Sequence, residues 1–391
     1  MRLDSTAVSQ FLSRYRRSVR AVLAIFVWSR LALWGVAIFA LLVFVPNRNP
    51  NAERWDSERL HELGYGIDVW ARWDSDWYLR IAEDGYSGSP SSTPAFFPLY
   101  PGLVAGLGRV LGGHYVLAGV LLSLAACAAA FALLYRLAVP RLGEEGALRA
   151  VLYLAVFPTA LFLQAVYSES LYLTLVLGAF LLAERDRFLG SGAVAGLALL
   201  TRPVGIALLP ALAVLAWRAP HRRRALLELA VAVPVAALYP LLLGIWIDEP
   251  FAFLRAQEGI WERSLSWAGP LGGLWEGVVA LFDTDPARDL ALNVQQLAFT
   301  LLFLVLAVVA WRRFGAPYGL FALGSLVVPL SAPAERMPLL STSRFGLVVF
   351  PLVLVLAAIA TRARVHEAII AVSSLLLGVA VVQWALWQWV A

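Results

Sequence analysis

The sequence contains no lysine, so all 31 of its basic residues are arginine. This absence excludes Schiff-base and lysine-nucleophile chemistry. A single cysteine, Cys127, excludes an internal disulfide, and its apolar surroundings predict that it packs as a small hydrophobic side chain. The histidines are scattered without metal-ligand spacing, and neither a Rossmann nor a P-loop glycine fingerprint occurs. We therefore expect no metal and no cofactor.

Charge is also scarce. Only 15% of the residues are charged and 61% are hydrophobic, whereas a soluble domain is roughly half apolar and a quarter charged. Long uncharged runs extend from Val19 to the C-terminus, so the sequence predicts one all-helical membrane domain over residues 1–391. The net charge of +5 is better explained by arginines at the membrane surface than by nucleic-acid binding, and no nucleic-acid partner is expected.

The apolar runs predict a polytopic bundle of about eleven spans. Some are shorter than the roughly 20 residues that cross a bilayer squarely, and Pro203 interrupts one pair. The run ending at Val45 is too long for a signal peptide and is expected to be the first span. The candidate spans are 20–45, 114–139, 149–164, 168–184, 189–201, 203–217, 225–247, 293–311, 316–332, 344–361 and 366–389.

Arginines recur in alternate loops of this arrangement. Because cytoplasmic loops are enriched in basic residues, the pattern predicts a multi-pass cell-membrane protein with a cytoplasmic N-terminus. Two long loops, approximately 46–113 and 248–292, then lie on the outer face. The arginine-bearing loops are 136–149, 185–187, 218–224, 312–313 and 362–364.

The first outer loop is rich in acidic residues and tryptophan. Apolar residues at helical spacing over 70–82 predict a helix in the outer interface, with its tryptophans toward lipid or protein. Asp74 would lie one turn from two tryptophans, where burial favours a carboxylate that acts as a general base. The alternative is a surface carboxylate on an amphipathic helix. The apolar positions are Trp70, Trp73, Trp77 and Ile81.

Two short motifs follow. Asp74 and Asp76 spell a D-x-D pair, but residues i and i+2 of a helix point about 200° apart, so we do not expect them to hold one metal ion. The three prolines of residues 94–101 interrupt a regular helix. The aromatic residues among them suit a sugar-stacking wall, or the segment is a plain re-entry elbow before residues 102–112.

Polar residues also occur at the outer ends of apolar runs, among them Glu169, Arg202 and Arg344. A charge there is costly unless it is paired, lines a wet cavity or reaches the interface. The arginine fork matches phosphate oxygens, and the alternative is snorkelling to lipid headgroups. Arg30 lies near the middle of the first span and is expected to pair within the bundle.

Several of these segments resemble the PIG-V mannosyltransferase family, membrane glycosyltransferases of the GT-C fold class. The similarity extends from about residue 26 to about residue 355. It implies transfer of mannose from a polyprenyl-phosphate carrier on the outer or lumenal side, with Asp74 as the catalytic residue. Family members more usually carry a small or apolar residue at the position of Asp76. The segments are RWDSDWYLRIAEDGY (72–86), AFFPLYP (95–101), FPTALFLQAVYSESLYL (157–173), LLTRPVG (199–205) and STSRFGLVVFP (341–351).

The sequence therefore predicts an inverting, GT-C type glycosyltransferase of the cell envelope, with interfacial helices in a large first outer loop. Its partners would be a polyprenyl-phosphate sugar donor, membrane lipid and an acceptor left open among glycan, lipid and protein. The alternatives are a transporter or flippase for lipid-linked sugars, which would carry charges inside its spans, and a subunit without activity. Besides catalytic Asp74, the candidate substrate-binding residues are Arg72, Trp73, Asp76, Tyr86, Phe97, Tyr100, Glu169, Arg202 and Arg344.

Overall fold

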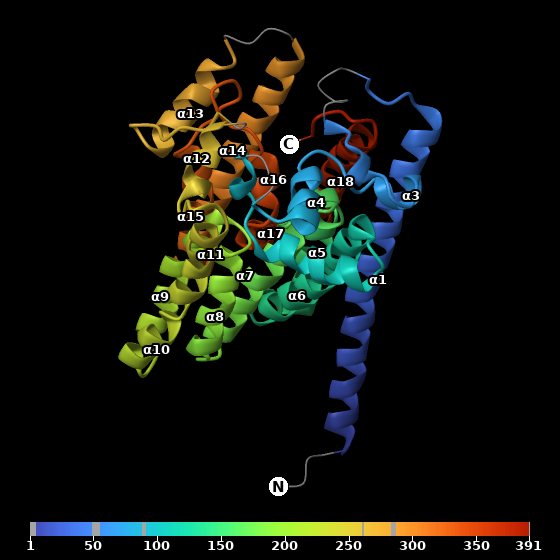
Figure 1. The fold of residues 1–391 in the computed structure, drawn as a ribbon. Helices are drawn as coiled ribbons and strands as arrows, with labels where there is room; N and C mark the ends of the chain where they lie inside the picture. The colour runs from blue at the N-terminus through green and yellow to red at the C-terminus, as the bar shows by residue number, and fades with distance from the viewer. Residues whose placement is uncertain (1–4, 49–54, 88–90, 260–261, 283–286, 391) are drawn as a thin grey trace.

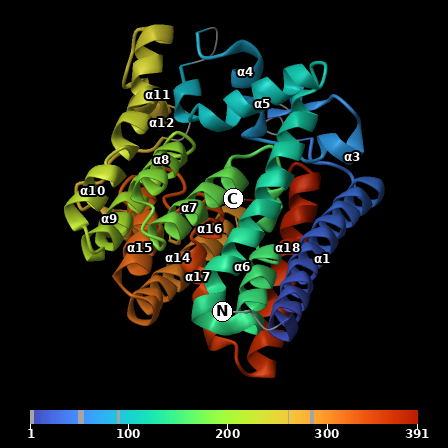
Figure 2. The ribbon, with the colours of Figure 1, turned by 90° about the horizontal axis from the view of Figure 1, so that it is seen from below.

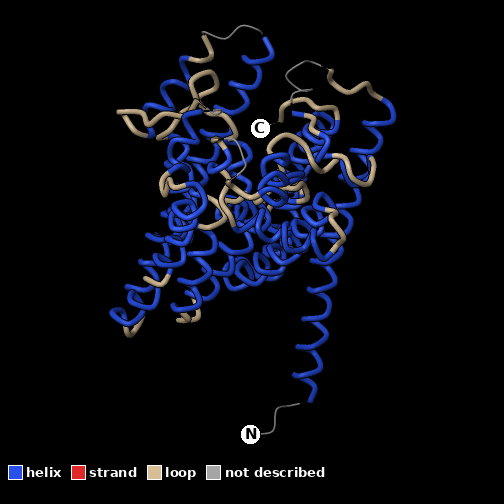
Figure 3. The backbone as a smooth tube through the Cα atoms, viewed as in Figure 1, coloured by secondary structure: helices blue, strands red, loops and turns tan. Residues whose placement is uncertain are grey.

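The computed structural model describes residues 5–48, 55–87, 91–259, 262–282 and 287–390. Parts of the two predicted outer loops, at 49–54, 88–90, 260–261 and 283–286, lie outside the described residues. Within the described ranges the chain is helical and forms no strand (Figure 3), apart from one isolated antiparallel bridge between Arg263 and Ala334. The predicted all-α class is confirmed.

Seventeen α-helices are described, together with four 3-10 turns, η1 to η4. The α-helices are α1 (Ser5–Val43), α3 (Tyr65–Asp68), α4 (Ser75–Asp84), α5 (Leu99–Val110), α6 (Tyr115–Ala155), α7 (Glu169–Ala183), α8 (Phe188–Leu199), α9 (Leu208–Arg218), α10 (Arg222–Leu229), α11 (Ala232–Ile247), α12 (Ala252–Gly259), α13 (Pro270–Val279), α14 (Ala287–Phe314), α15 (Ala316–Leu330), α16 (Thr342–Leu347), α17 (Phe350–Ile359) and α18 (Ala363–Ala385). The 3-10 turns are η1 (Glu58–Leu60), η2 (Thr93–Ala95), η3 (Ala160–Leu163) and η4 (Pro203–Ala207).

Five segments of the described chain are long and apolar enough to cross a membrane. Shorter apolar helices fill the space between them, and the pair at 189–201 and 203–217 is interrupted at Pro203 as predicted. The long segments are Arg17–Val43, Tyr115–Ala155, Arg222–Ile247, Asp289–Phe314 and Ala363–Ala385.

Two predicted spans are wrong as continuous helices. In 149–164 the helix α6 ends at Ala155 and only the short turn η3 follows. In 344–361 the chain breaks between α16 and α17. Pro158 and Pro351 lie at these breaks, and a proline supplies no backbone N–H to the turn before it. The result is irregular backbone within the bundle, which membrane proteins tolerate where other protein covers it.

Arg30 holds one of these breaks in place. Its side chain is 2% exposed, and its guanidinium donates to the carbonyl oxygens of Ala155 and Ala160, at 3.0 Å each. The last carbonyls of a helix lack partners within the helix, so the arginine satisfies groups that lipid cannot. The predicted pairing of Arg30 within the bundle is confirmed, and it joins α1 to the end of α6.

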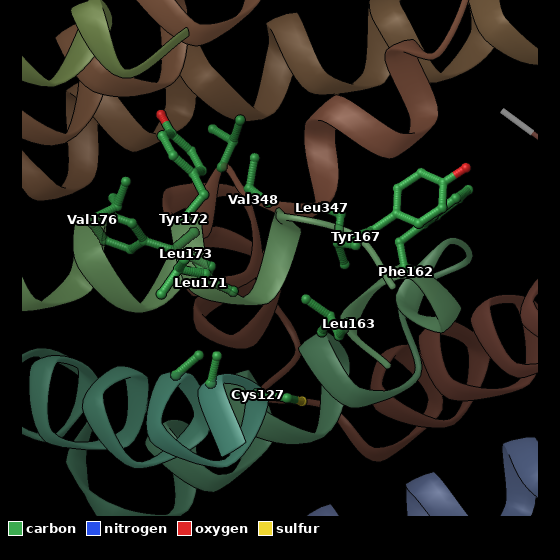
Figure 4. Close-up of a cluster of buried hydrophobic side chains, with 14 of the residues drawn as sticks. Cys127, Phe162, Leu163, Tyr167, Leu171, Tyr172, Leu173, Val176, Leu347 and Val348 are labelled. Carbon is green, nitrogen blue, oxygen red and sulfur yellow. The ribbon is translucent and has the colours of Figure 1, made fainter. Parts of the chain in front are cut away.

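The core surrounds the irregular segment between α6 and α7. Figure 4 shows Phe162 and Leu163 of this segment, with Leu347 of α16 near the centre of the view and Tyr172 of α7 on the other side. All four side chains are buried, and Cys127 of α6 is buried with them, as predicted for a lone thiol. Close packing on both sides therefore fixes the short stretch of chain that leads into α7.

The two ends of the molecule differ. In Figure 1 the start of α1 and helices α8 to α10 lie at the lower end, whereas α4, α12 and α13 lie at the upper end, where the longer connections gather. Helices α1, α6 and α18 lie side by side in Figure 2, and α1 contacts both of the others.

This arrangement makes the orientation testable. A reporter fused after Arg224 is expected to be cytoplasmic, and one inserted near Ser91 is expected on the outer face, because the arginine-rich loops favour the cytoplasm. Protease protection or an enzymatic reporter measures each position. If both reporters lie in the same compartment, the predicted order of spans is wrong.

Candidate active site

The backbone before α4 has an unusual conformation. Trp73 has a φ of 51°, in the left-handed region that non-glycine residues rarely occupy. The predicted helix over 70–82 therefore begins only at Ser75, and Asp74 stands directly before its first turn. The tryptophans of this segment are buried against protein: Trp70 is 0% and Trp77 is 6% exposed.

Tyr167, in the segment between η3 and α7, holds this turn in place. Its hydroxyl accepts the backbone N–H of Asp74 at 3.0 Å and donates to the carbonyl oxygen of Arg72 at 3.3 Å. The hydroxyl of Ser75 accepts the N–H of Arg72 at 3.1 Å. These bonds bracket Trp73 on both sides, so the strained turn and the position of the Asp74 carboxylate are fixed together.

Four predicted site residues form one chain of charges. Nη1 of Arg344, in α16, donates to Oδ2 of Asp74 at 2.9 Å, and its Nε lies 3.5 Å from Oε1 of Glu169. Glu169 begins α7, and its Oε1 also contacts Nη1 of Arg202, just before η4. The side chains are 1–11% exposed. Buried charges such as these are stable only when they are paired with charges of opposite sign.

Three arginines surround the ring of Phe345, next to this group of paired charges, and bring more positive than negative charge to the site. The guanidinium carbons of Arg202, Arg263 and Arg344 lie 5.7, 5.7 and 5.6 Å from the centroid of its ring. Arg263 donates to the carbonyl oxygens of residues 332 and 340, at 3.0 and 2.9 Å. Burial, and then the neighbouring Arg344, lowers the pKa of Arg263 to about 10. A bound anion would relieve this repulsion.

Asp74 also borders a cavity of about 200 Å³. Trp55, Trp73 and Trp389 contribute aromatic walls, which suit the apolar face of a sugar ring. The contact with Arg344 is made by Oδ2 of Asp74, and Oδ1 has no hydrogen-bond partner among the described residues. The other lining residues are Glu262, Ala334, Arg336, Met337 and Leu340.

Asp76 is engaged elsewhere. Its carboxylate accepts from Ser57, lies 3.5 Å from Nε of Arg59 and receives Arg80 at 3.1 Å. These partners join the chain around η1 to α4. Asp74 and Asp76 therefore bind different arginines, and their carboxylates do not meet at a shared position.

Arg72 is held by neighbouring backbone and an aromatic ring. It donates to the carbonyl oxygens of Asp68 and Ala71, at 2.9 and 3.0 Å, and its guanidinium lies 4.6 Å from the ring centroid of Trp387. Burial lowers its pKa to about 10, so it keeps its charge at neutral pH. The structure thus places Arg72 between the backbone of residues 68–71 and Trp387 of the C-terminal segment.

The three remaining candidates lie in an aromatic layer behind the charges. Tyr100 shares a hydrogen bond of 2.9 Å with Ser123. The hydroxyl of Tyr86 donates to the carbonyl oxygen of Phe96 at 2.6 Å, and Phe97 packs on Tyr239 with ring centroids 4.6 Å apart. The helix α5 begins at Leu99, so Pro101 lies in its first turn, where its missing N–H is not needed. None of Tyr86, Phe97 and Tyr100 lines the cavity beside Asp74.

Sequence reasoning missed Tyr167, Arg263 and Phe345. Tyr167 belongs to a polar group that ends with Glu169 and Ser170, but nothing in the sequence indicated its contact with residues 72–74, and Phe345 lies beside Arg344 without a polar group of its own. Arg263 lies in the second predicted outer loop, and this loop reaches the site through its bridge and hydrogen bonds to residues 331–340, which are distant in the sequence.

The pairing of Glu169 leads to a prediction about stability. Glu169→Gln leaves Arg202 and Arg344 with less compensation, and removal of one partner of a buried pair costs about 3–5 kcal/mol. Thermal unfolding of the purified protein in detergent is expected to show a large fall in Tm. Glu228→Gln is the control, because Glu228 pairs with the exposed Arg224 and such pairs contribute less than about 1 kcal/mol. Equal Tm values for the two variants would contradict a buried network.

Known proteins share part of this sequence and this fold. Residues 97–246 match the profile of the dolichyl-phosphate-mannose-protein mannosyltransferase family. Among curated protein sequences, none matches the chain.

Two crystal structures of ArnT from Cupriavidus metallidurans are similar in fold. The one bound to undecaprenyl phosphate has a TM-score of 0.52 and 15% identity, covering 89% of this chain and 62% of that one. The apo structure has a TM-score of 0.54 and 14% identity, covering 89% and 61%. The chain therefore spans less than two thirds of the length of ArnT. With its apolar helices, this similarity identifies the chain as an all-α membrane protein with the GT-C fold.

Proposed function

We propose that this protein is an inverting membrane glycosyltransferase that transfers mannose from a polyprenyl-phosphate carrier to an acceptor hydroxyl on the outer face. The observation that carries the proposal is the pairing of Asp74 with Arg344 at the edge of a tryptophan-lined cavity, beside a cluster of three arginines. The matched mannosyltransferase profile and the resemblance to the PIG-V family support mannose as the sugar.

The arginine cluster supports a phosphate-bearing donor. Arg202, Arg263 and Arg344 bring three positive charges to a site whose paired carboxylates are Asp74 and Glu169. Guanidinium groups bind phosphate oxygens through two parallel N–H donors. ArnT has been crystallised with undecaprenyl phosphate, which supports a polyprenyl phosphate as the carrier in this fold.

In this reaction Asp74 and the three arginines have separate roles. Asp74 takes the proton of the acceptor hydroxyl through its free Oδ1, and the acceptor oxygen attacks the anomeric carbon of the donor sugar. The bond between that carbon and the phosphate oxygen breaks, and its electron pair leaves with the polyprenyl phosphate. The arginines stabilise the phosphate as its negative charge grows. Attack opposite the leaving phosphate inverts the anomeric configuration.

The cavity beside Asp74 supports the acceptor side of this scheme. Trp73 packs edge-on against Trp389, with ring centroids 5.3 Å apart, so the aromatic wall is rigid. Such walls bind sugars through their apolar faces. The acceptor would be a hydroxyl group of a glycan, a lipid or a protein.

The arrangement also predicts which donors and additives matter. Purified protein is expected to transfer label from polyprenyl-phosphate mannose in the presence of EDTA and to ignore guanosine-diphosphate mannose, because Asp74 and Asp76 bind separate arginines and do not share a metal position. Transfer is measured with radiolabelled donors. Loss of activity on chelation that manganese restores would contradict the prediction and favour a metal held by the D-x-D pair.

A further inference from the structure

A second cavity lies at the opposite end of the bundle. Its volume is about 450 Å³, and its walls come from α1, α6 and the connection between α17 and α18. None of its lining residues belongs to the cavity beside Asp74. His366 of α18 lines this cavity and shares a hydrogen bond of 2.7 Å with Tyr153 of α6. This bond fixes the spacing between the two helices, so the cavity is built into the fold.

Two arginines of this cavity lack partners. Arg149, in α6, and Arg362, just before α18, line the wall. Among the described residues, neither guanidinium has an ion pair, and Nε of Arg149 is buried without a hydrogen-bond partner. A buried donor without a partner is costly. Arg149, which is half-buried, and the exposed Arg362 therefore offer an anion two guanidinium groups in one cavity.

The polar end of the cavity has further donors. Thr361 lines it with a hydroxyl, and Ala363 begins α18, whose N-terminus has no side-chain cap. The first N–H groups of a helix have no partners within it and favour negative charge. Arg362 and Ala363, at the N-terminal end of the 23-residue helix α18, both line this cavity.

The rest of the cavity is apolar. Ile25 of α1 and Leu148 and Leu152 of α6 continue the wall away from the arginines. The neighbouring surface of α1 is also apolar and exposed, with Leu23 at 51% and Trp28 at 72%. A cationic end next to an apolar wall, beside an exposed apolar helix surface, complements the polarity of an anionic phospholipid, whereas a soluble phosphate would use only the cationic end.

We propose that this cavity binds an anionic glycerophospholipid, with the headgroup phosphate between Arg149 and Arg362 and an acyl chain along Ile25, Leu148 and Leu152. The site is separate from the proposed glycosyl transfer and holds whether or not that proposal is correct. It joins α1, α6 and α18, the helices that Arg30 and the Tyr153–His366 bond already connect. Glu145 lies on the same wall and weakens anion binding through its negative charge.

The test is a lipid titration of the purified, delipidated protein in a nonionic detergent, followed by thermal unfolding. Phosphatidylglycerol is expected to raise the Tm, because a ligand of the folded state stabilises it. The double variant Arg149→Gln/Arg362→Gln is expected to need about 25-fold more lipid for the same effect, from about fivefold for each arginine near a membrane surface. Glu145→Gln is expected to need about fivefold less. Arg313→Gln, an exposed arginine at the end of α14, is the control and is expected to match the parent.

The outcomes separate the parts of the proposal. Equal titrations of the parent and the double variant would overturn the site. An equal effect of phosphatidylcholine would overturn its selectivity for anions. An equal effect of glycerol 3-phosphate, lost in the double variant, would support the phosphate position and overturn its assignment to a lipid.

Discussion

Asp74→Asn is expected to lower the rate of sugar transfer by about 10²–10⁴-fold, the contribution of a general base. Asparagine keeps the shape of the side chain and an oxygen that accepts from Arg344, but it cannot take the proton of the acceptor hydroxyl. The bonds of Tyr167 to the backbone around Trp73 do not involve the carboxylate, so the turn should persist. Expression and membrane insertion should stay normal, and initial rates at matched protein levels measure the effect.

Asp76→Asn is the matched control for this change. Asp76 lies two residues away, but it binds Ser57, Arg59 and Arg80 and does not line the cavity. Its loss should lower stability slightly and leave most of the transfer rate. If Asp74→Asn retains near-normal turnover while Asp56, Asp68 or Asp76 proves indispensable, Asp74 is not the base. If every acidic residue in 46–98 can be neutralised without loss, the glycosyltransferase proposal itself fails.

Arg344→Gln is expected to reduce turnover by about 10²–10³-fold, the cost of removing one group that stabilises charge in the transition state. Among the described residues, only Arg344 forms ion pairs with both Asp74 and Glu169, so it both orients the proposed base and adds positive charge beside the leaving phosphate. Arg344→Lys keeps the charge but loses the planar fork and should recover only part of the rate. Single-turnover measurements with saturating donor separate this effect from weaker binding.

Arg336→Gln serves as the comparison for Arg344. Arg336 also lines the cavity, but its side chain is 77% exposed and pairs with Asp289. Because exposed pairs contribute little, this variant should keep most of the activity. Similar losses in both arginine variants would indicate a general effect of charge at the cavity and would contradict a specific role for Arg344.

The sequence predicted the class of fold because hydropathy in a membrane protein directly determines which segments can cross lipid. It failed where the backbone changes direction inside the bundle. The runs 149–164 and 344–361 are apolar throughout, so nothing in their hydropathy indicated that α6 ends at Ala155 or that α16 and α17 are separate. Pro158 and Pro351 are visible in the sequence, but a proline alone does not distinguish a kink from a break.

Part of the candidate site was also predictable, because the positions of charged residues within apolar runs can be read directly from the sequence. Charges at the ends of apolar runs are costly, and this signal identified Glu169, Arg202 and Arg344 before their contacts were known. Contacts between distant segments could not be derived in this way. Arg30 reaches the carbonyls of the α6 end, and Arg263 reaches the site only because its loop docks on residues 332–340. The position of Asp74 could not be derived from the sequence either, because it depends on the left-handed backbone conformation of Trp73. This conformation places the start of α4 at Ser75, after Asp74.

Transfer of label from radiolabelled polyprenyl-phosphate mannose, measured in membranes that contain either the parent protein or Asp74→Asn at matched levels, tests the proposed function most directly. With the parent protein, label is expected to leave the carrier and appear in a new product whose anomeric configuration is opposite to that of the donor. With Asp74→Asn, the rate should fall by about 10²–10⁴-fold. If label instead stays on the carrier and only changes its side of the membrane, the protein is a transporter of lipid-linked sugars and the proposed transfer is wrong.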